Sequence, residues 1–111
     1  MESDYEDVKQ RLMTDERIKK YLYKFLDSVD FEGLSQNLEA KEYEEAFRYA
    51  HNLKGVTANL SLSLLNRSSG ILCEALRGGE PKEDISPLLQ AVTADYDRVV
   101  TAITQMRNEE A

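Results

Sequence analysis

Apolar residues recur along the chain at alternating spacings of three and four positions, which is typical of helices that bury one face. Four segments carry this pattern, and we therefore predict bundle helices at roughly residues 15–38, 42–60, 62–77 and 87–108. Leu64 and Ile71 widen the third apolar face. The four faces consist, in chain order, of Ile18, Leu22, Phe25 and Val29; of Ala46, Ala50, Leu53, Thr57 and Leu60; of Leu62, Leu65, Ser69, Leu72 and Leu76; and of Leu89, Val92, Tyr96, Val99, Ile103 and Met106.

Glycine, proline and serine mark the connection between the third and fourth predicted helices. Gly78 and Gly79, followed by Pro81, end the third helix, because glycine tolerates a left-handed backbone and proline cannot continue the helix. Ser86 and Pro87 begin the fourth helix, with serine as the N-cap and proline at the first helical position.

Three further features bear on the helix boundaries. Asp30 offers an N-cap for a short helix that bears Leu34 and Leu38. Ser61 and Ser63 are candidate caps between the second and third predicted helices. A short additional N-terminal helix is expected to lie across the bundle, and its apolar residues are Tyr5, Val8 and Leu12.

The composition fits a single helical domain. The chain has 111 residues, and its 5 Gly and 2 Pro are too few for the regular turns of a small β-sandwich. Four amphipathic helices with short connections bury their apolar faces best in an antiparallel four-helix bundle. The same spacing would also serve a coiled-coil dimer, but the short connections and the wide third face favour a closed bundle. We therefore expect an all-α monomer in which residues 1–111 form one domain.

Several classes of protein are excluded by composition. A single cysteine, Cys73, is incompatible with a disulfide framework or a thiolate metal cluster within one chain. No apolar run approaches the roughly 18 residues of a membrane span, and the acidic start of the chain does not resemble a signal peptide. A net charge of -7 argues against nucleic acid as a partner. We therefore expect a cytoplasmic protein that binds neither membrane nor nucleic acid.

The middle of the chain differs from the rest in charge. Residues 46–79 contain four basic residues but only one acid, Glu74. This part also holds the only histidine, His51. On a helical wheel, His51 points about 140° away from the buried face of its helix, between Arg48 and Lys54.

Gly55 also faces away from the core in mid-helix, where glycine costs roughly 1 kcal/mol relative to alanine. Two interpretations fit. In the first, the neutral imidazole of His51 accepts a phosphoryl group, Lys54 neutralises the added charge, and Gly55 lets a second protein close over the imidazole. In the second, His51 is an incidental surface histidine. Composition and spacing alone give the two interpretations about equal weight.

The residues around His51 add a more specific signal. Residues 50–60 read AHNLKGVTANL. This segment resembles the signature of histidine-containing phosphotransfer (HPt) domains, which is A-H-x-L-K-G followed by small residues and N-L-G. The similarity extends from about Tyr43 to Arg77. Ser61 departs from the family, which commonly has glycine there, and Cys73 stands where some members place a glutamine that bonds the imidazole or the phosphate.

The resemblance implies a phosphocarrier in a two-component phosphorelay, without kinase activity of its own. His51 would take a phosphoryl group from the aspartate of one response-regulator receiver domain and pass it to another. Lys54 would stabilise the phosphate charge and Gly55 would leave access for the receiver. A hybrid sensor histidine kinase is an expected partner. No cofactor and no metal site are expected, because the Mg²⁺ of the transfer belongs to the receiver. The expected partner-binding residues are Phe47, Arg48, Ala58 and Leu62.

The principal alternative is a non-catalytic helical bundle that binds other proteins and carries an incidental surface histidine. An enzyme that uses His51 as a general base is disfavoured by the surrounding residues. A di-metal site in a bundle needs a Glu-x-x-His pair, and position 48 is arginine. The sequence also lacks a glycine-rich phosphate loop, which disfavours autonomous kinase activity.

Overall fold

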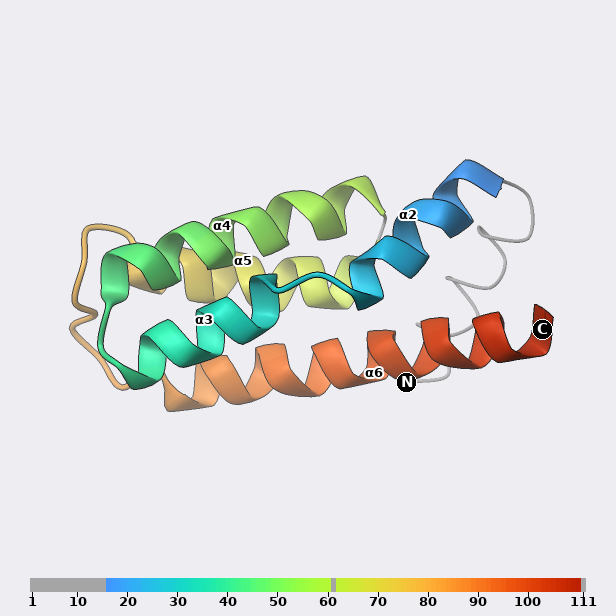
Figure 1. Ribbon diagram of the computed structural model, residues 1–111. Helices are drawn as coiled ribbons and strands as arrows, with labels where there is room; N and C mark the ends of the chain where they lie inside the picture. Colours follow the sequence, from blue (N-terminus) through green and yellow to red (C-terminus); the bar gives the residue numbers. More distant parts are fainter. Residues whose placement is uncertain (1–15, 61, 111) are drawn as a thin grey trace.

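The computed structural model describes residues 16–60 and 62–110, with side chains for residues 19–60 and 62–109. The described part is helical and contains no strand, which confirms the predicted all-α class. The predicted N-terminal helix and the candidate cap Ser61 lie outside the described residues. No described helix is both long and apolar enough to cross a membrane. The helices, labelled as in Figure 1, are α2 (Glu16–Leu26), α3 (Asp30–Glu39), α4 (Tyr43–Asn59), α5 (Ser63–Leu76) and α6 (Ser86–Glu110).

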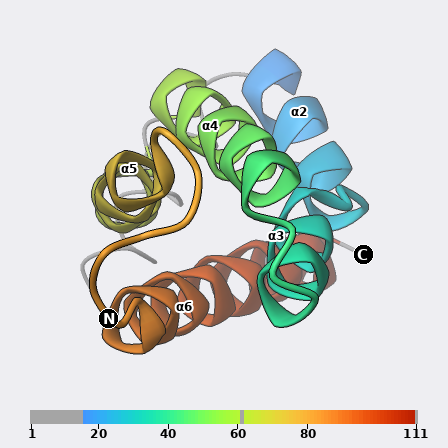
Figure 2. The ribbon, with the colours of Figure 1, turned by 90° about the vertical axis from the view of Figure 1, so that its left-hand side faces the viewer.

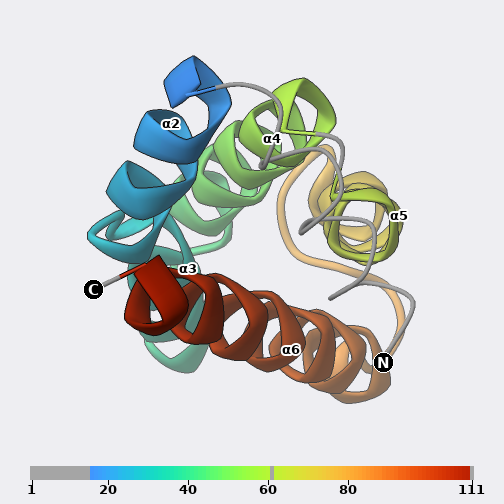
Figure 3. The same cartoon turned by 90° about the vertical axis from the view of Figure 1, so that its right-hand side faces the viewer.

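The helices form an antiparallel bundle with four corners. α3, α4, α5 and α6 alternate in direction along the bundle (Figure 1). α4 packs against both α3 and α5, and α5 packs in turn against α6. The end views place α2 on the same side of the bundle as α3, and α2 also packs on α6 (Figures 2 and 3). α2 and α3 therefore share one corner of the predicted four-helix bundle.

The core is continuous and contains most of the predicted apolar faces. Tyr96 of α6 joins the shared corner to it: its ring stacks on Phe31 of α3 with 4.2 Å between centroids and lies 5.9 Å from the ring of Phe25 of α2. One α6 side chain thus contacts both helices of that corner. The buried apolar residues of the core are Leu22, Phe25, Leu34, Leu38, Ala46, Ala50, Leu53, Leu62, Leu65, Leu72, Cys73, Leu76, Val92, Val99, Ile103 and Met106.

The prediction of one continuous helix over residues 15–38 is wrong, because the chain breaks between Leu26 and Asp30. The amide N–H groups of Asp27 and Ser28 donate to carbonyls three residues back, which tightens and ends α2. The Ser28 hydroxyl then accepts a hydrogen bond from the Asp30 N–H at 3.2 Å. Short polar side chains compete with the helix for backbone hydrogen bonds in this way, and the run Asp-Ser ends α2.

The residues that bind the free N–H groups at the helix N-termini also differ from the prediction. Ser28 rather than Asp30 binds the free N–H at the start of α3, and Asp30 is the first helical residue. Asp84 plays this role for α6, where its carboxylate accepts a hydrogen bond from the Ser86 N–H at 3.0 Å. α5 begins at Ser63 without a side-chain cap. In each case the predicted polar residue lies just inside the helix, where its side chain cannot reach back to the first turn's N–H groups.

The end of the third predicted helix is confirmed. Gly78 and Gly79 have φ values of 88° and 108°, the left-handed region that glycine adopts without steric cost. Two residues of the predicted apolar faces are nevertheless on the surface: Val29 is 62% exposed and Ile71 is 51% exposed. Val29 lies in the break after α2, where the helical phase is lost. Ile71 lies on α5, and at 100° of rotation per residue it stands roughly 130° around the helix axis from the middle of the buried face of α5.

The same substitution at two mid-helix glycines is expected to change stability in opposite directions. A Cβ atom at Gly33 would lie 2.5 Å from the Tyr49 ring, so the ring must move and α3 loses packing against α4. A Cβ atom at Gly55 would meet nothing within 4 Å. We expect Gly33→Ala to lower the free energy of unfolding by about 1 kcal/mol, and Gly55→Ala to raise it by about 0.5–1 kcal/mol.

Urea denaturation of both variants measures these changes. A Gly33→Ala variant that is more stable than the wild type would contradict the packing argument, because it would mean that Tyr49 moves aside without cost.

Candidate functional site

α4 turns His51 towards the surface. The inner face of the helix is buried and repeats every three or four residues, so that the residues between these positions must point outward. His51, Lys54 and Gly55 are all exposed, and the placement predicted from the helical wheel is confirmed. The buried residues that set this orientation are Ala46, Ala50, Leu53 and Thr57.

The α4 backbone beside Gly55 is held by a side chain from α5. The Asn66 side-chain amide donates hydrogen bonds to the Lys54 carbonyl oxygen at 2.8 Å and to the Thr57 hydroxyl at 3.3 Å. The Thr57 hydroxyl lies 2.8 Å from the Leu53 carbonyl oxygen and 3.0 Å from that of Lys54. These contacts fasten the helix immediately before Gly55, where a glycine would otherwise loosen it.

Lys54 lies across the neighbouring helix. Its methylene groups pass over Gly70 of α5, with Cε 3.6 Å and Cδ 3.7 Å from the point where a Cβ atom of residue 70 would stand. The stem therefore rests on the α5 backbone while the ammonium group stays at the surface, as long basic side chains do. The position of the charge beside His51 is thus defined by two helices.

Phe47 and Arg77 cover the side of His51 nearer the start of α4. Phe47 lies one turn before His51, and the centroids of the two rings are 6.1 Å apart. The Arg77 guanidinium lies 5.4 Å from the same phenyl centroid. Its Nε and Nη2 atoms donate to the two carboxylate oxygens of Glu74 at 3.1 and 2.8 Å. The phenyl ring of Phe47 is therefore a common neighbour of the imidazole and of a guanidinium that is bound to a carboxylate.

These contacts define an α4–α5 seam, which is the line of contact that joins Phe47 to Arg77 and Lys54 to Gly70. Phe47 lies seven residues before Lys54 on α4, and Arg77 lies seven residues after Gly70 on α5, as expected for antiparallel neighbours. The same register places His51 opposite Cys73.

The side chain opposite His51 does not complete the site. Cys73 is fully buried within the core, so its thiol faces inward while His51 faces solvent. Burial raises the pKa of the Cys73 thiol, and the charges of Lys54 and Arg77 act in the opposite direction. The glutamine contact that some family members make from this position therefore has no counterpart in Cys73.

Charges along the seam also act on Glu74. The hydrogen bond and the positive charge of Arg77 lower the pKa of the Glu74 carboxyl, and Lys54 lowers it slightly further. Glu74 in turn raises the pKa of the Arg77 guanidinium. Both groups are therefore charged at neutral pH, and Glu74 is within electrostatic reach of both cations of the seam.

The structure places three of the four predicted partner-binding residues around His51. Arg48 and Ala58 are exposed, and Phe47 is half-buried at the seam. Arg48 is paired with Glu45 on the same helix at 3.0 Å. The assignment of Leu62 is wrong, because this side chain is only 4% exposed. It belongs to the core at the turn into α5, where it cannot contact a partner.

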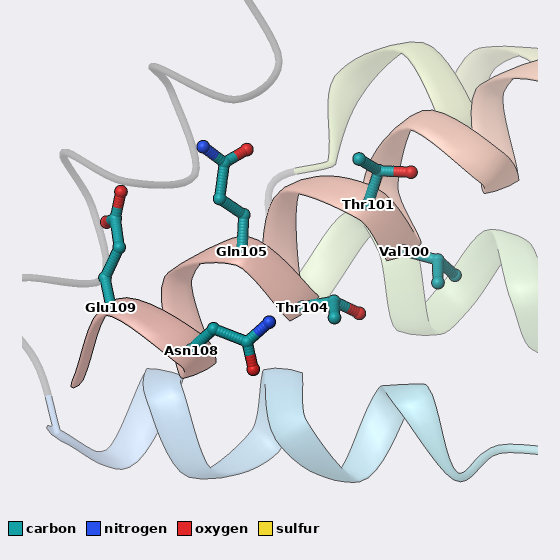
Figure 4. Close-up of a pocket in the computed structure, with 6 residues that line it drawn as sticks. All are labelled: Val100, Thr101, Thr104, Gln105, Asn108 and Glu109. Carbon is teal, nitrogen blue, oxygen red and sulfur yellow. The ribbon is translucent and has the colours of Figure 1, made fainter. Parts of the chain in front are cut away.

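Two surface hollows of the described part lie away from His51. One, of about 530 Å³, lies along the second half of α6 (Figure 4). Another, of about 730 Å³, lies between the end of α5 and the start of α6, and Arg77 forms part of its wall. Among the described side chains, no group of three His, Cys, Asp or Glu residues is placed to bind a metal ion. The candidate site is an exposed surface of α4.

Comparison with known families identifies the family to which this surface belongs. The family model described as Hpt domain matches residues 22–108. The chain belongs to the Hpt domain family. No curated protein and no solved structure shows significant similarity to it. Hpt domains are phosphocarriers that act in histidine phosphotransfer within phosphorelays, and their partners are two-component proteins such as receiver domains and kinases.

Sequence reasoning assigned no role to three residues that shape the surroundings of His51: Asn66, Gly70 and Arg77. The signal that could have found them is the short turn between α4 and α5. An antiparallel hairpin with so short a turn aligns residues at nearly equal distances from it, which brings Gly70 to Lys54 and Arg77 to Phe47. Such alignment gives the helix register but not the side-chain rotamers, and the Asn66 hydrogen bonds depend on those.

The Asn66 contact leads to a test of stability. Asn66→Asp keeps the shape of the side chain but removes the N–H donor and places a carboxylate against the Lys54 carbonyl oxygen. We expect the free energy of unfolding to fall by about 1–3 kcal/mol, as measured by urea denaturation. Asn52→Asp, the same change at an exposed α4 position, is the control and should have little effect. Equal stability of the two variants would mean that Asn66 does not hold α4.

Proposed function

We propose that His51 is the phosphoacceptor of a phosphorelay, taking a phosphoryl group from a receiver-domain aspartate and passing it to a second receiver. The observation that carries this proposal is an exposed imidazole on α4, next to Lys54 and to the open surface at Gly55, inside the region matched by the Hpt domain family. An exposed nucleophile suits a partner that supplies the rest of the active site.

The chemistry requires little from this chain beyond the imidazole. A lone pair on a ring nitrogen of His51 attacks the phosphorus of the aspartyl phosphate, a P–N bond forms, and the P–O bond to the aspartate breaks as the carboxylate leaves. Transfer to the second receiver reverses these events at its own aspartate. Positioning and charge stabilisation provide most of the catalysis in phosphoryl transfer. The Mg²⁺ that offsets phosphate charge during transfer is assigned to the receiver.

Lys54 and Gly55 have supporting roles in this proposal. Lys54 lies one turn after His51, and its stem rests on Gly70, so its ammonium group is placed to offset the charge of a phosphoryl group. A Cβ atom at Gly55 would meet nothing within 4 Å, which leaves the surface beside the imidazole free for the wall of a receiver active site. Phe47, Arg48 and Ala58 surround this opening and are the proposed receiver contacts.

The proposed function is tested with phosphorylated receiver domains and Mg²⁺. We expect the protein to gain one phosphoryl group by intact mass, and the adduct to be labile in acid and stable in alkali, as a phosphohistidine is. His51→Gln should fold as the wild type and gain no phosphoryl group. If the variant is phosphorylated like the wild type, His51 is not the acceptor. If no receiver in a broad panel phosphorylates the folded wild type, a purely protein-binding bundle is the remaining interpretation.

The role of Gly55 is tested by adding bulk in two steps. Gly55→Leu should leave the fold intact, because the position faces open space, but should reduce the rate of receiver transfer at least tenfold by blocking approach to His51. Gly55→Ala is the matched control, with the same backbone change and little added volume. Transfer rates from stopped reactions compare the variants. Equal rates for Gly55→Leu and the wild type would show that the glycine does not provide access.

A further inference from the structure

One acid lies among the cations of the α4–α5 seam. Glu74 is the only acidic residue in residues 46–79. It makes a bidentate pair with Arg77, and its charge also interacts with that of Lys54. In the register of the seam, Glu74 directly follows Cys73, the residue opposite His51. The carboxylate therefore belongs to the stretch of α5 that runs past the imidazole.

A carboxylate and a phosphoryl group bind a guanidinium in the same way. Each presents two oxygen atoms to two parallel N–H donors, and this arrangement is among the strongest hydrogen-bonded pairs in proteins. Glu74 already occupies the Nε and Nη2 donors of Arg77. A phosphoryl group brings a charge of about −2 and three acceptor oxygens. Placed on His51, whose ring neighbours the phenyl ring that Arg77 lies against, it would compete with Glu74 for the same cation.

The resting pair is suited to such an exchange. The Arg77 and Glu74 side chains are 58% and 59% exposed, and exposed ion pairs contribute little to the stability of a fold. Arg77 stands at the end of α5, where the backbone leaves the helix, and its side chain lies against Phe47. The guanidinium can therefore exchange Glu74 for another anion without disturbing the core.

We infer that Glu74 is a positioning residue that holds Arg77 in a resting ion pair and competes with a phosphoryl group on His51 for the guanidinium, thereby shortening the lifetime of the phosphohistidine. This inference rests on the proposed function of His51. Loss of the phosphoryl group is hydrolysis: a water oxygen bonds to phosphorus, the P–N bond breaks, and the ring nitrogen takes up a proton. Arg77, when bound to the phosphoryl oxygens, stabilises the intact phosphohistidine and slows this loss.

The test loads His51 without a receiver and follows its decay. Phosphoramidate, a small donor, transfers its phosphoryl group to the imidazole as its own P–N bond breaks and ammonia leaves. The half-life at neutral pH is then measured by ³¹P NMR. We expect Glu74→Gln to lengthen the half-life about two- to fivefold, and Arg77→Gln to shorten it. Glu39→Gln, which removes an equal charge at the exposed end of α3, should match the wild type.

A double-mutant cycle separates competition for Arg77 from direct repulsion between Glu74 and the phosphoryl group. If Glu74 acts through Arg77, Glu74→Gln has no effect on the half-life once residue 77 is glutamine. Glu74→Asp, which keeps the carboxylate, should return the half-life towards the wild-type value. Circular dichroism before loading checks that each variant is folded, so that a change in half-life does not reflect a loss of the fold.

The outcomes are distinguishable from those of the proposed function. An unchanged or shorter half-life in Glu74→Gln overturns the inference, and so does a lengthening that persists in the Arg77→Gln background. Failure of phosphoramidate-loaded wild type to pass its phosphoryl group to any receiver overturns the proposed function instead. It leaves the comparison of half-lives intact, because that comparison requires no receiver.

Discussion

The close approach of α4 to α5 is the constraint on which the surroundings of His51 depend. Gly70 has no side chain, so the stem of Lys54 can lie directly over the α5 backbone. Asn66 then reaches across and binds the Lys54 carbonyl oxygen. A bulky side chain at position 70 would displace the Lys54 stem, and the lysine charge would move with it. The packing of α4 against α5 therefore decides where the Lys54 charge lies relative to the imidazole of His51.

The same bundle that orders these groups keeps the imidazole itself exposed. Buried residues on the inner face of α4 fix the direction of His51, and the open surface at Gly55 leaves space beside it. A phosphocarrier has to fit into a partner's active site, so an exposed histidine is more useful to it than one enclosed in a cleft. Stability comes from the core, while the exposed ion pair of Glu74 and Arg77 contributes little to it and is available for a functional role.

The predictions that failed share a physical origin. Apolar periodicity identified the helices, but it continued across the break between α2 and α3, where Ser28 forms a local hydrogen bond that periodicity does not register. Leu62 was predicted both for the third apolar face and for partner binding, and its burial at the turn into α5 agrees only with the first. Cys73 departs from the glutamine that some members of the family place there, and its burial confirms that its thiol does not face the surface that holds His51. In each case the sequence determined the position of the residue along the chain, but the packing of the helices decided where its side chain points.

The sequence by itself determined the helical class, most of the buried face of each helix, and the outward direction of His51, because these depend only on the period of a helix and the burial of apolar residues. It also carried the family signature around that histidine. The tertiary structure alone decided which side chains meet across the α4–α5 seam. Arg77 reaches Phe47, and Asn66 reaches the Lys54 carbonyl oxygen, through rotamers that are set by how the two helices pack.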